Sequence, residues 1–192
     1  MLPILEPYSE QVARWPASGR HILAAFDAST VVVYQAYRPE IATWAVEHQR
    51  LGGPAFSTSR MSWVKPNFLW MMHRCGWATK ENQERVLGIR IDRAFFEEIL
   101  ATAIPSTWNA EDFTTREEWQ AAVAGSSVRL QWDPDHDPTG RAVDRRAIQL
   151  GLRGEMLRRL AEDAVEILDV TPIAIAGRDL TTPSRWSELL TG

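Results

Sequence analysis

The segment Arg60-Met61-Ser62-Trp63-Val64-Lys65-Pro66 carries residue types that bind phosphorylated ligands. Pro66 predicts the first position of a helix, where the backbone N–H groups of the first turn lack partners and attract anions. Arg60 and Lys65 precede that position, and Trp63 between them offers a flat ring for stacking. The segment therefore predicts a phosphate or nucleotide site. In the alternative, Lys65 is solvated, Arg60 pairs with a carboxylate and Trp63 is buried.

The basic residues strengthen this interpretation. Lys65 and Lys80 are the only two lysines among 21 basic residues, and both flank the same tryptophan-rich segment. A drift toward arginine codons explains the general bias. A lysine kept under such drift indicates a position where a compact charge is not equivalent to a planar guanidinium.

A second group of polar side chains follows the run Ser127–Trp132, which predicts a strand. Gln131 and Asp133 at the end of this run are candidate catalytic groups at a sheet edge, and a plain turn at Asp133-Pro134 is the alternative. The segment from Gln131 to Pro138 contains three aspartates and one histidine. Because it has two prolines and lacks the glycine of a calcium loop, we expect no metal.

Two further pairs of residues are expected in the same cleft. Gln35 and Tyr37 end a hydrophobic strand, and alternation places them on one face with Tyr34 on the other. Arg146 and Gln149 are more polar than the strand-like run that holds them, which predicts that both point into the cleft. Burial of the tyrosines in the core is the alternative.

Helices and strands must position these side chains, and their order predicts an α+β fold. The apolar patterns predict one domain over residues 1–192, with its core at about 20–176, a mixed or mostly antiparallel sheet and no regular βαβα order. Strands are expected at His21–Phe26, Ser29–Tyr37, Arg85–Ile91, Ser127–Trp132 and Val170–Ala176. Helices are expected from Pro39 toward Gly52, at Pro66–Cys75, after Asp92, at Thr115–Ala124 and at Gly154–Glu166.

The helix predicted at Pro66–Cys75 is apolar on nearly every face. Such a helix has no side to offer to solvent, so it should lie in the centre of the molecule. The side chains expected to be buried are Phe68, Leu69, Trp70, Met71 and Met72.

Composition limits the class of protein. The chain has 192 residues, 45% hydrophobic and 24% charged, which is typical of a soluble domain with a sizeable core. A net charge of −4 argues against coating nucleic acid by bulk charge. We expect no membrane span, because no apolar run reaches about 20 residues, and no secretory signal, because the N-terminus MLPILEPYSE lacks a basic start followed by an apolar stretch. Cys75 is the one cysteine, which fits the expected cytoplasmic location. The motifs of serine hydrolases and zinc proteases are absent from the sequence.

Five segments together resemble the domain-of-unknown-function family 4291, over roughly His21 to Thr171. They are VYQAY (33–37), RMSWVKPNFLWMMHRCGW (60–77), NQERVL (82–87), QWDP (131–134) and RAIQLGL (146–152). The layout is also similar to the ADP-ribosyltransferase-like fold, which implies NAD binding in the cleft of a split mixed sheet. The chain departs from the family pattern at Leu23, where an arginine is usual, at Phe26, where a tyrosine is common, and at Asp135-His136, where the family has Glu-Arg. If the usual arginine binds the cofactor, that contact is missing here.

The expected function is a nucleotide-using transferase, and the resemblance implies NAD-dependent ADP-ribosyl transfer to an RNA or protein acceptor. The cations Arg60 and Lys65 and the helix start are expected to hold the pyrophosphate, with Tyr37 or Trp63 stacked on a ring of the ligand. A carboxylate or amide from Asp133, Gln131 or Gln149 would polarise the ribose. The alternative is a non-catalytic module that binds a nucleotide or single-stranded RNA. A third alternative is an interaction protein whose tryptophans are all in the core.

Overall fold

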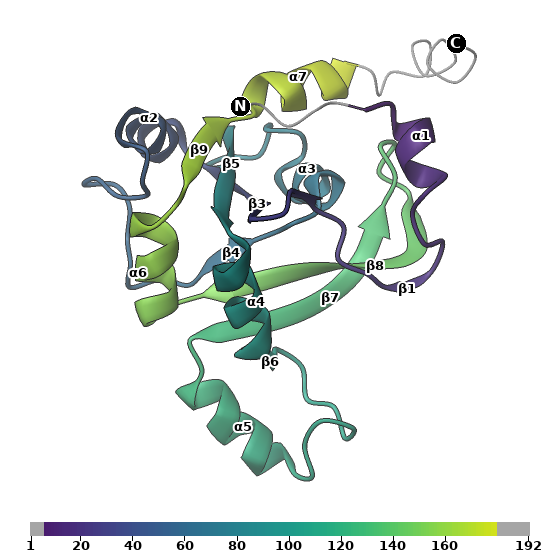
Figure 1. Ribbon diagram of the computed structural model, residues 1–192, viewed down its shortest axis with the longest axis vertical. Coiled ribbons are helices and arrows are strands. Elements are labelled where there is room, and N and C mark those ends of the chain that lie inside the picture. The colour runs from purple at the N-terminus through teal and green to yellow at the C-terminus, as the bar shows by residue number, and fades with distance from the viewer. Residues whose placement is uncertain (1–5, 180–192) are drawn as a thin grey trace.

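The computed structural model describes residues 6–179, which form two β-sheets surrounded by helices (Figure 1). The pairing is antiparallel except between β1 and β8 and between β6 and β7. This confirms the α+β class and the mixed, mostly antiparallel sheet. The first sheet contains β1 (Gly19–Arg20), β8 (Ala142–Leu152), β7 (Val128–His136) and β6 (Ile104–Pro105), with β4 (Ser62–Val64) also paired to β8. The second contains β2 (Ala25–Phe26), β3 (Thr30–Tyr37), β5 (Arg85–Asp92) and β9 (Glu166–Asp169).

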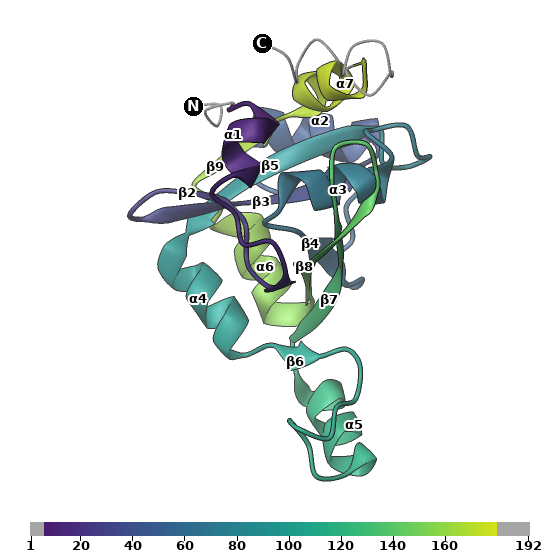
Figure 2. The same cartoon turned by 90° about the vertical axis from the view of Figure 1, so that its right-hand side faces the viewer.

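The second sheet separates two hydrophobic clusters, because its strands are apolar on both faces. On β3, Val31 and Val33 face the larger cluster and Val32 and Tyr34 face the smaller one. Helices α2 (Pro39–His48), α4 (Arg93–Ala101) and α6 (Gly154–Glu162) pack in the larger cluster, and α3 (Phe68–Cys75) and α7 (Thr171–Asp179) pack in the smaller one (Figures 1 and 2). A short α1 (Tyr8–Val12) precedes them.

The first sheet has one apolar face and one polar face. Ile148, Leu150 and Leu152 of β8 are buried in the larger cluster. Since side chains alternate along a strand, Gln149 of β8 projects from the opposite face. This alternation makes one face of the sheet available for polar chemistry.

The two sheets meet at a single isolated backbone bridge in the described part of the chain. Lys65, directly after β4, accepts a hydrogen bond from Tyr34 N–H at 2.7 Å and donates one to Tyr34 O at 2.9 Å. Lys65 therefore links the end of β4 in the first sheet to β3 in the second.

The central helix is buried as predicted, but it begins two residues later. Trp70, Met71 and Met72 are at most 4% exposed, and Phe68 and Leu69 are half-buried. Asn67 is the N-cap of α3, and its side-chain oxygen accepts a hydrogen bond from Trp70 N–H at 3.1 Å. This cap, rather than Pro66, fixes the start of the helix.

The predicted strand Val170–Ala176 is wrong, because this segment forms α7. Asp169 Oδ1 accepts hydrogen bonds from both the backbone N–H and the hydroxyl of Thr171, and Pro172 lies in the first turn. Both features are typical of a helix start. The predicted helix Gly154–Glu166 is correspondingly too long, since β9 begins at Glu166 and pairs with β5.

Two other expectations need correction. Of the predicted strand His21–Phe26, Ala25–Phe26 alone is in a sheet. The alternative of a plain turn at Asp133-Pro134 is also wrong, because β7 continues to His136 with a register irregularity between Pro134 and His136. An irregularity of this kind accommodates a proline, which has no N–H for the ladder.

The predicted helix at Thr115–Ala124 is α5 (Arg116–Gly125), and it begins with a capping box in which Thr115 and Glu118 each cap the backbone N–H of the other. It projects from the bottom of the molecule (Figure 1). Among residues 6–179, no helix combines the length and the apolar character needed to cross a bilayer.

Candidate functional site

A cavity of about 810 Å³, which we call the polar cavity, lies beside the bridge between the two sheets. It brings together eight of the nine predicted site residues, although they come from β3, β7, β8 and the segment 60–65 around β4. These residues are Gln35, Tyr37, Arg60, Trp63, Lys65, Gln131, Asp133 and Gln149.

Asp133 is held by two amide side chains on the polar face of the first sheet. Gln131 Nε2 donates to its Oδ1 and Gln149 Nε2 donates to its Oδ2, both at 2.7 Å. Gln131 and Gln149 are direct partners across β7 and β8, and Asp133 follows two residues later on the same face. The three side chains therefore form one fixed acidic group in the wall of the cavity.

Lys65 is the one lysine in this cavity, and its side chain is only 5% exposed. Its Nζ donates to Trp63 O at 2.7 Å and to Gln35 Oε1 at 3.2 Å. Burial and the nearby positive charge of Arg74 lower the pKa of Lys65 to about 7, although Asp133 acts in the opposite direction. Lys65 is therefore neither the solvated lysine of the alternative interpretation nor a permanently charged group at neutral pH.

The ring of Trp63, on β4, lies close to Gly151, its direct partner on β8. A Cβ atom at Gly151 would lie 2.9 Å from Trp63 Cε2 and 2.6 Å from Met61 Sδ. The glycine thus provides the space that the indole needs beside the cavity.

We expect Gly151→Ala to displace Trp63 and to lower the free energy of unfolding by about 1–3 kcal/mol, the usual cost of overpacking. Thermal unfolding measures this loss. Gly125→Ala is the matched control, because no atom lies within 4 Å of the Cβ position there. A midpoint for Gly151→Ala equal to that of Gly125→Ala would show that the close approach of Trp63 is not required.

Gln35 and Tyr37 lie on the same face of β3, as alternation predicts, but they differ in accessibility. Gln35 binds the lysine, whereas Tyr37 is only 8% exposed, with its hydroxyl 3.2 Å from Ser62 Oγ. Burial raises the pKa of Tyr37 to about 12. Tyr37 is therefore mainly a core side chain, and Trp63 is the better candidate for stacking on a ligand.

Two parts of the predicted site do not reach the polar cavity. Arg146 is exposed and lies three residues from Gln149 on β8, so the two side chains project from opposite faces of the sheet. The helix start is also elsewhere, since Asn67 and Phe68 line a different cavity. The N–H groups of α3 therefore do not contribute to an anion site with Arg60 and Lys65.

The sequence reasoning missed several polar residues of the cavity. Arg38 follows β3, and Arg74 lies in the last turn of α3, so both add positive charge to the lining. Exposed arginines at helix and strand ends carry no distinctive sequence signal. Phe56, Asn82 and Gln83 also line the cavity.

The aspartate-rich run after Trp132 forms an ion pair instead of a cluster of oxygen ligands. Asp135 and Arg145 are at most 4% exposed, with Arg145 Nη2 2.6 Å from Asp135 Oδ2. His136 stacks on His73 with ring centroids 3.6 Å apart. Over residues 6–179, no three His, Cys, Asp or Glu side chains are grouped to hold a metal ion.

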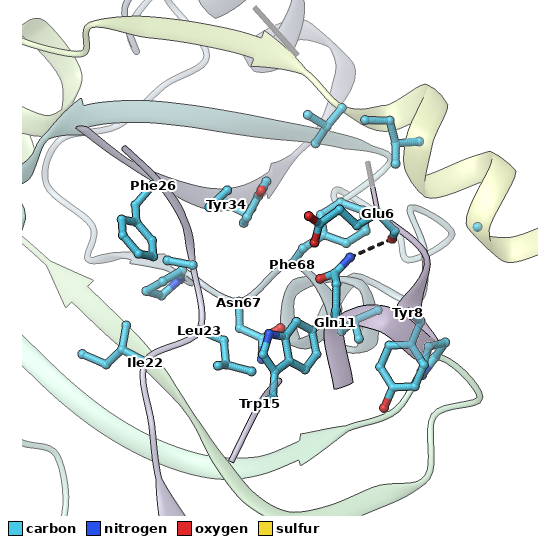
Figure 3. Close-up of a pocket in the computed structure, with 18 of the residues that line it drawn as sticks. Glu6, Tyr8, Gln11, Trp15, Ile22, Leu23, Phe26, Tyr34, Asn67 and Phe68 are labelled. Carbon is cyan, nitrogen blue, oxygen red and sulfur yellow. Dashed lines mark hydrogen bonds between the residues drawn. The ribbon is translucent and has the colours of Figure 1, made fainter. Parts of the chain in front are cut away.

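A second cavity of about 590 Å³, the apolar cavity, lies between α1, β2 and the start of α3 (Figure 3). Leu23 and Phe26, two of the positions that depart from the family pattern, line this cavity and not the polar one. Trp15, Tyr34 and Phe68 surround it with aromatic rings.

The comparisons with known proteins identify the family of the chain. A search of curated proteins finds no match. The family model described as Domain of unknown function (DUF4291) matches residues 21–190, a range that includes both sheets apart from β1 and all the residues of the polar cavity. The chain therefore belongs to the DUF4291 family.

Proposed function

We propose that this protein binds a nucleotide in the polar cavity and transfers a group from it, with NAD as the donor. One observation supports this most strongly: cations, an indole ring and a fixed carboxylate, from segments far apart in the sequence, line the same cavity. A core of packed tryptophans would not require such a convergence of polar groups.

The cavity fits a nucleotide in size and charge. Its volume of about 810 Å³ lies in the range of roughly 300–1,000 Å³ that is usual for small-molecule sites. Arg38, Arg60 and Arg74 line it, and the guanidinium of Arg60 makes no hydrogen bond or ion pair with any other described residue. A free guanidinium can bind two oxygens of one phosphate at once.

Asp133 is the candidate catalytic residue. NAD supplies an ADP-ribosyl group bonded to nicotinamide, a good leaving group. The Asp133 carboxylate, oriented by Gln131 and Gln149, would stabilise the positive charge that develops at the ribose as that bond breaks. Trp63 offers a ring surface for stacking. The choice of NAD among nucleotides rests on the similarity to the ADP-ribosyltransferase-like layout, which is an analogy at the level of the fold.

Thermal unfolding in the presence of NAD, ATP, nucleoside monophosphates and short RNA tests the binding step. A ligand at about 100 times its Kd stabilises a protein by about 2.7 kcal/mol, so the midpoint should rise by several degrees with NAD. Unchanged midpoints with all four ligands would contradict the proposal.

Arg60→Met should weaken NAD binding by about tenfold or more, because a charge-assisted contact contributes roughly 1.5–3 kcal/mol. Titration calorimetry measures the affinity. Arg158→Met is the control, since Arg158 is exposed on α6 and does not line the cavity. Equal affinities of the two variants for NAD would show that Arg60 does not contribute to binding.

A further inference from the structure

Lys65 has an unusual environment for a lysine that binds phosphate. Its two hydrogen-bond acceptors, Trp63 O and Gln35 Oε1, are neutral oxygens. Among residues 6–179, no carboxylate lies within ion-pair distance of Nζ. A buried ammonium without a carboxylate partner is costly, and the cost favours the neutral amine.

The neighbouring charges act on this amine in both directions. Arg74 is the nearby cation that disfavours protonation, and Asp133 and the Cys75 thiol favour it. Burial and Arg74 prevail, so the pKa of Lys65 falls to about 7. An amine that is desolvated beside another cation is a good nucleophile at neutral pH.

The cavity around Lys65 favours one class of electrophile. Arg38, Arg60 and Arg74 line the same space, so an anionic group on a ligand can be held while the rest of that ligand approaches the amine. We propose that Lys65 is a nucleophilic amine that forms an imine with a phosphorylated aldehyde bound in the polar cavity. This activity goes beyond nucleotide transfer, although it uses the same cavity.

The step is chemically balanced without an added oxidant or reductant. The lone pair of Lys65 Nζ attacks the aldehyde carbon, and the carbonyl oxygen takes up a proton to give a carbinolamine. The nitrogen then forms a double bond to that carbon, and the oxygen leaves as water with the two hydrogens that the amine has lost. Asp133 lines the same cavity and is the nearby group that can carry a proton.

The chain is well suited to a labelling experiment, because Lys80 is its one other lysine and is exposed. We would incubate the intact protein with pyridoxal 5′-phosphate at pH 7, trap the imine with borohydride and map the adduct by mass spectrometry. An ordinary lysine is less than about 0.1% neutral at this pH, so we expect Lys65 to react at least ~100-fold faster than Lys80. The rate at Lys65 should reach half its maximum near pH 7.

Two comparisons distinguish the role of the Lys65 amine from the role of the arginines that would bind the phosphate. Pyridoxal without its phosphate should react about tenfold more slowly with the wild-type protein, and Arg60→Met should remove this difference. Lys65→Arg keeps the positive charge but cannot form an imine, so the adduct should disappear while labelling at Lys80 is unchanged.

Equal labelling of Lys65 and Lys80, or an adduct at Lys65 that forms only above pH 9, would overturn the proposal. The wild-type result stands even if Lys65→Arg does not fold. Nucleotide-induced shifts in the unfolding midpoint are measured on the same samples. A protein that binds NAD but is not labelled at Lys65 would therefore refute the imine proposal and leave the nucleotide proposal in place.

Discussion

Arg145→Met is expected to lower the free energy of unfolding by about 3–5 kcal/mol, because it leaves the Asp135 carboxylate buried without its cation. Arg145 Nη1 also donates to Pro16 O at 2.8 Å, and its guanidinium lies 5.2 Å from the centre of the Trp15 ring. The variant should therefore also loosen the segment before β1. Urea unfolding measures the loss.

The neighbouring residue provides a matched control for this prediction. Arg146 is exposed on the same strand, so Arg146→Met should change stability little. Combining Arg145→Met with Asp135→Leu removes both charges and should be less destabilising than Arg145→Met alone. If Arg145→Met and Arg146→Met unfold at the same urea concentration, the buried pair does not stabilise the fold.

Asp133→Asn is expected to reduce group transfer from NAD by about 10²–10³-fold, the usual effect of removing one electrostatic contribution to a transition state. The substitution keeps the shape of the side chain, and rotation of one glutamine amide restores its hydrogen bonds. Binding of NAD should therefore change by only a few-fold. Release of nicotinamide and the affinity for NAD are measured side by side.

Asp144→Asn is the control, because Asp144 is exposed on β8 and does not line the polar cavity. If Asp133→Asn transfers the group at the wild-type rate, Asp133 is not a catalytic residue. If the wild-type protein binds NAD but releases no nicotinamide with any RNA or protein acceptor, it is a binding module and the transferase proposal is wrong.

Much of the fold could be predicted because local patterns and packing agree. The run Phe68–Met72 at the start of α3 is apolar, which predicts a buried helix, and Gly76 ends the helix with a φ of 58°. The capping box of α5 needs no tertiary contact to form. By contrast, Val170–Ala176 has the apolar composition of a strand, and the side chain of Asp169 and the position of Pro172 decide in favour of a helix.

The candidate site was predictable where a polar side chain interrupts an apolar strand. Gln35, Gln149 and Gln131 are of this kind, because an amide in a core strand must find a partner. The prediction for Arg146 was wrong because a residue three positions from Gln149 on a regular strand projects from the opposite face, and the polar character of the run outweighed this alternation in the prediction. Arg74 was missed because its place in the cavity depends on how α3 packs against the first sheet.

The bridge between Tyr34 and Lys65 also offers a local measure of how firmly the two sheets are joined beside the polar cavity. Within residues 6–179, two backbone hydrogen bonds hold the edges of the two sheets together, and Lys65 contributes to both. If the sheets separate, the main chain that carries the amine moves with β4, and its distance from Gln35 on β3 increases. Residues of both sheets also pack in the larger hydrophobic cluster, so we expect slow hydrogen exchange at the Tyr34 and Lys65 amides, and the exchange rate reports how often this bridge opens.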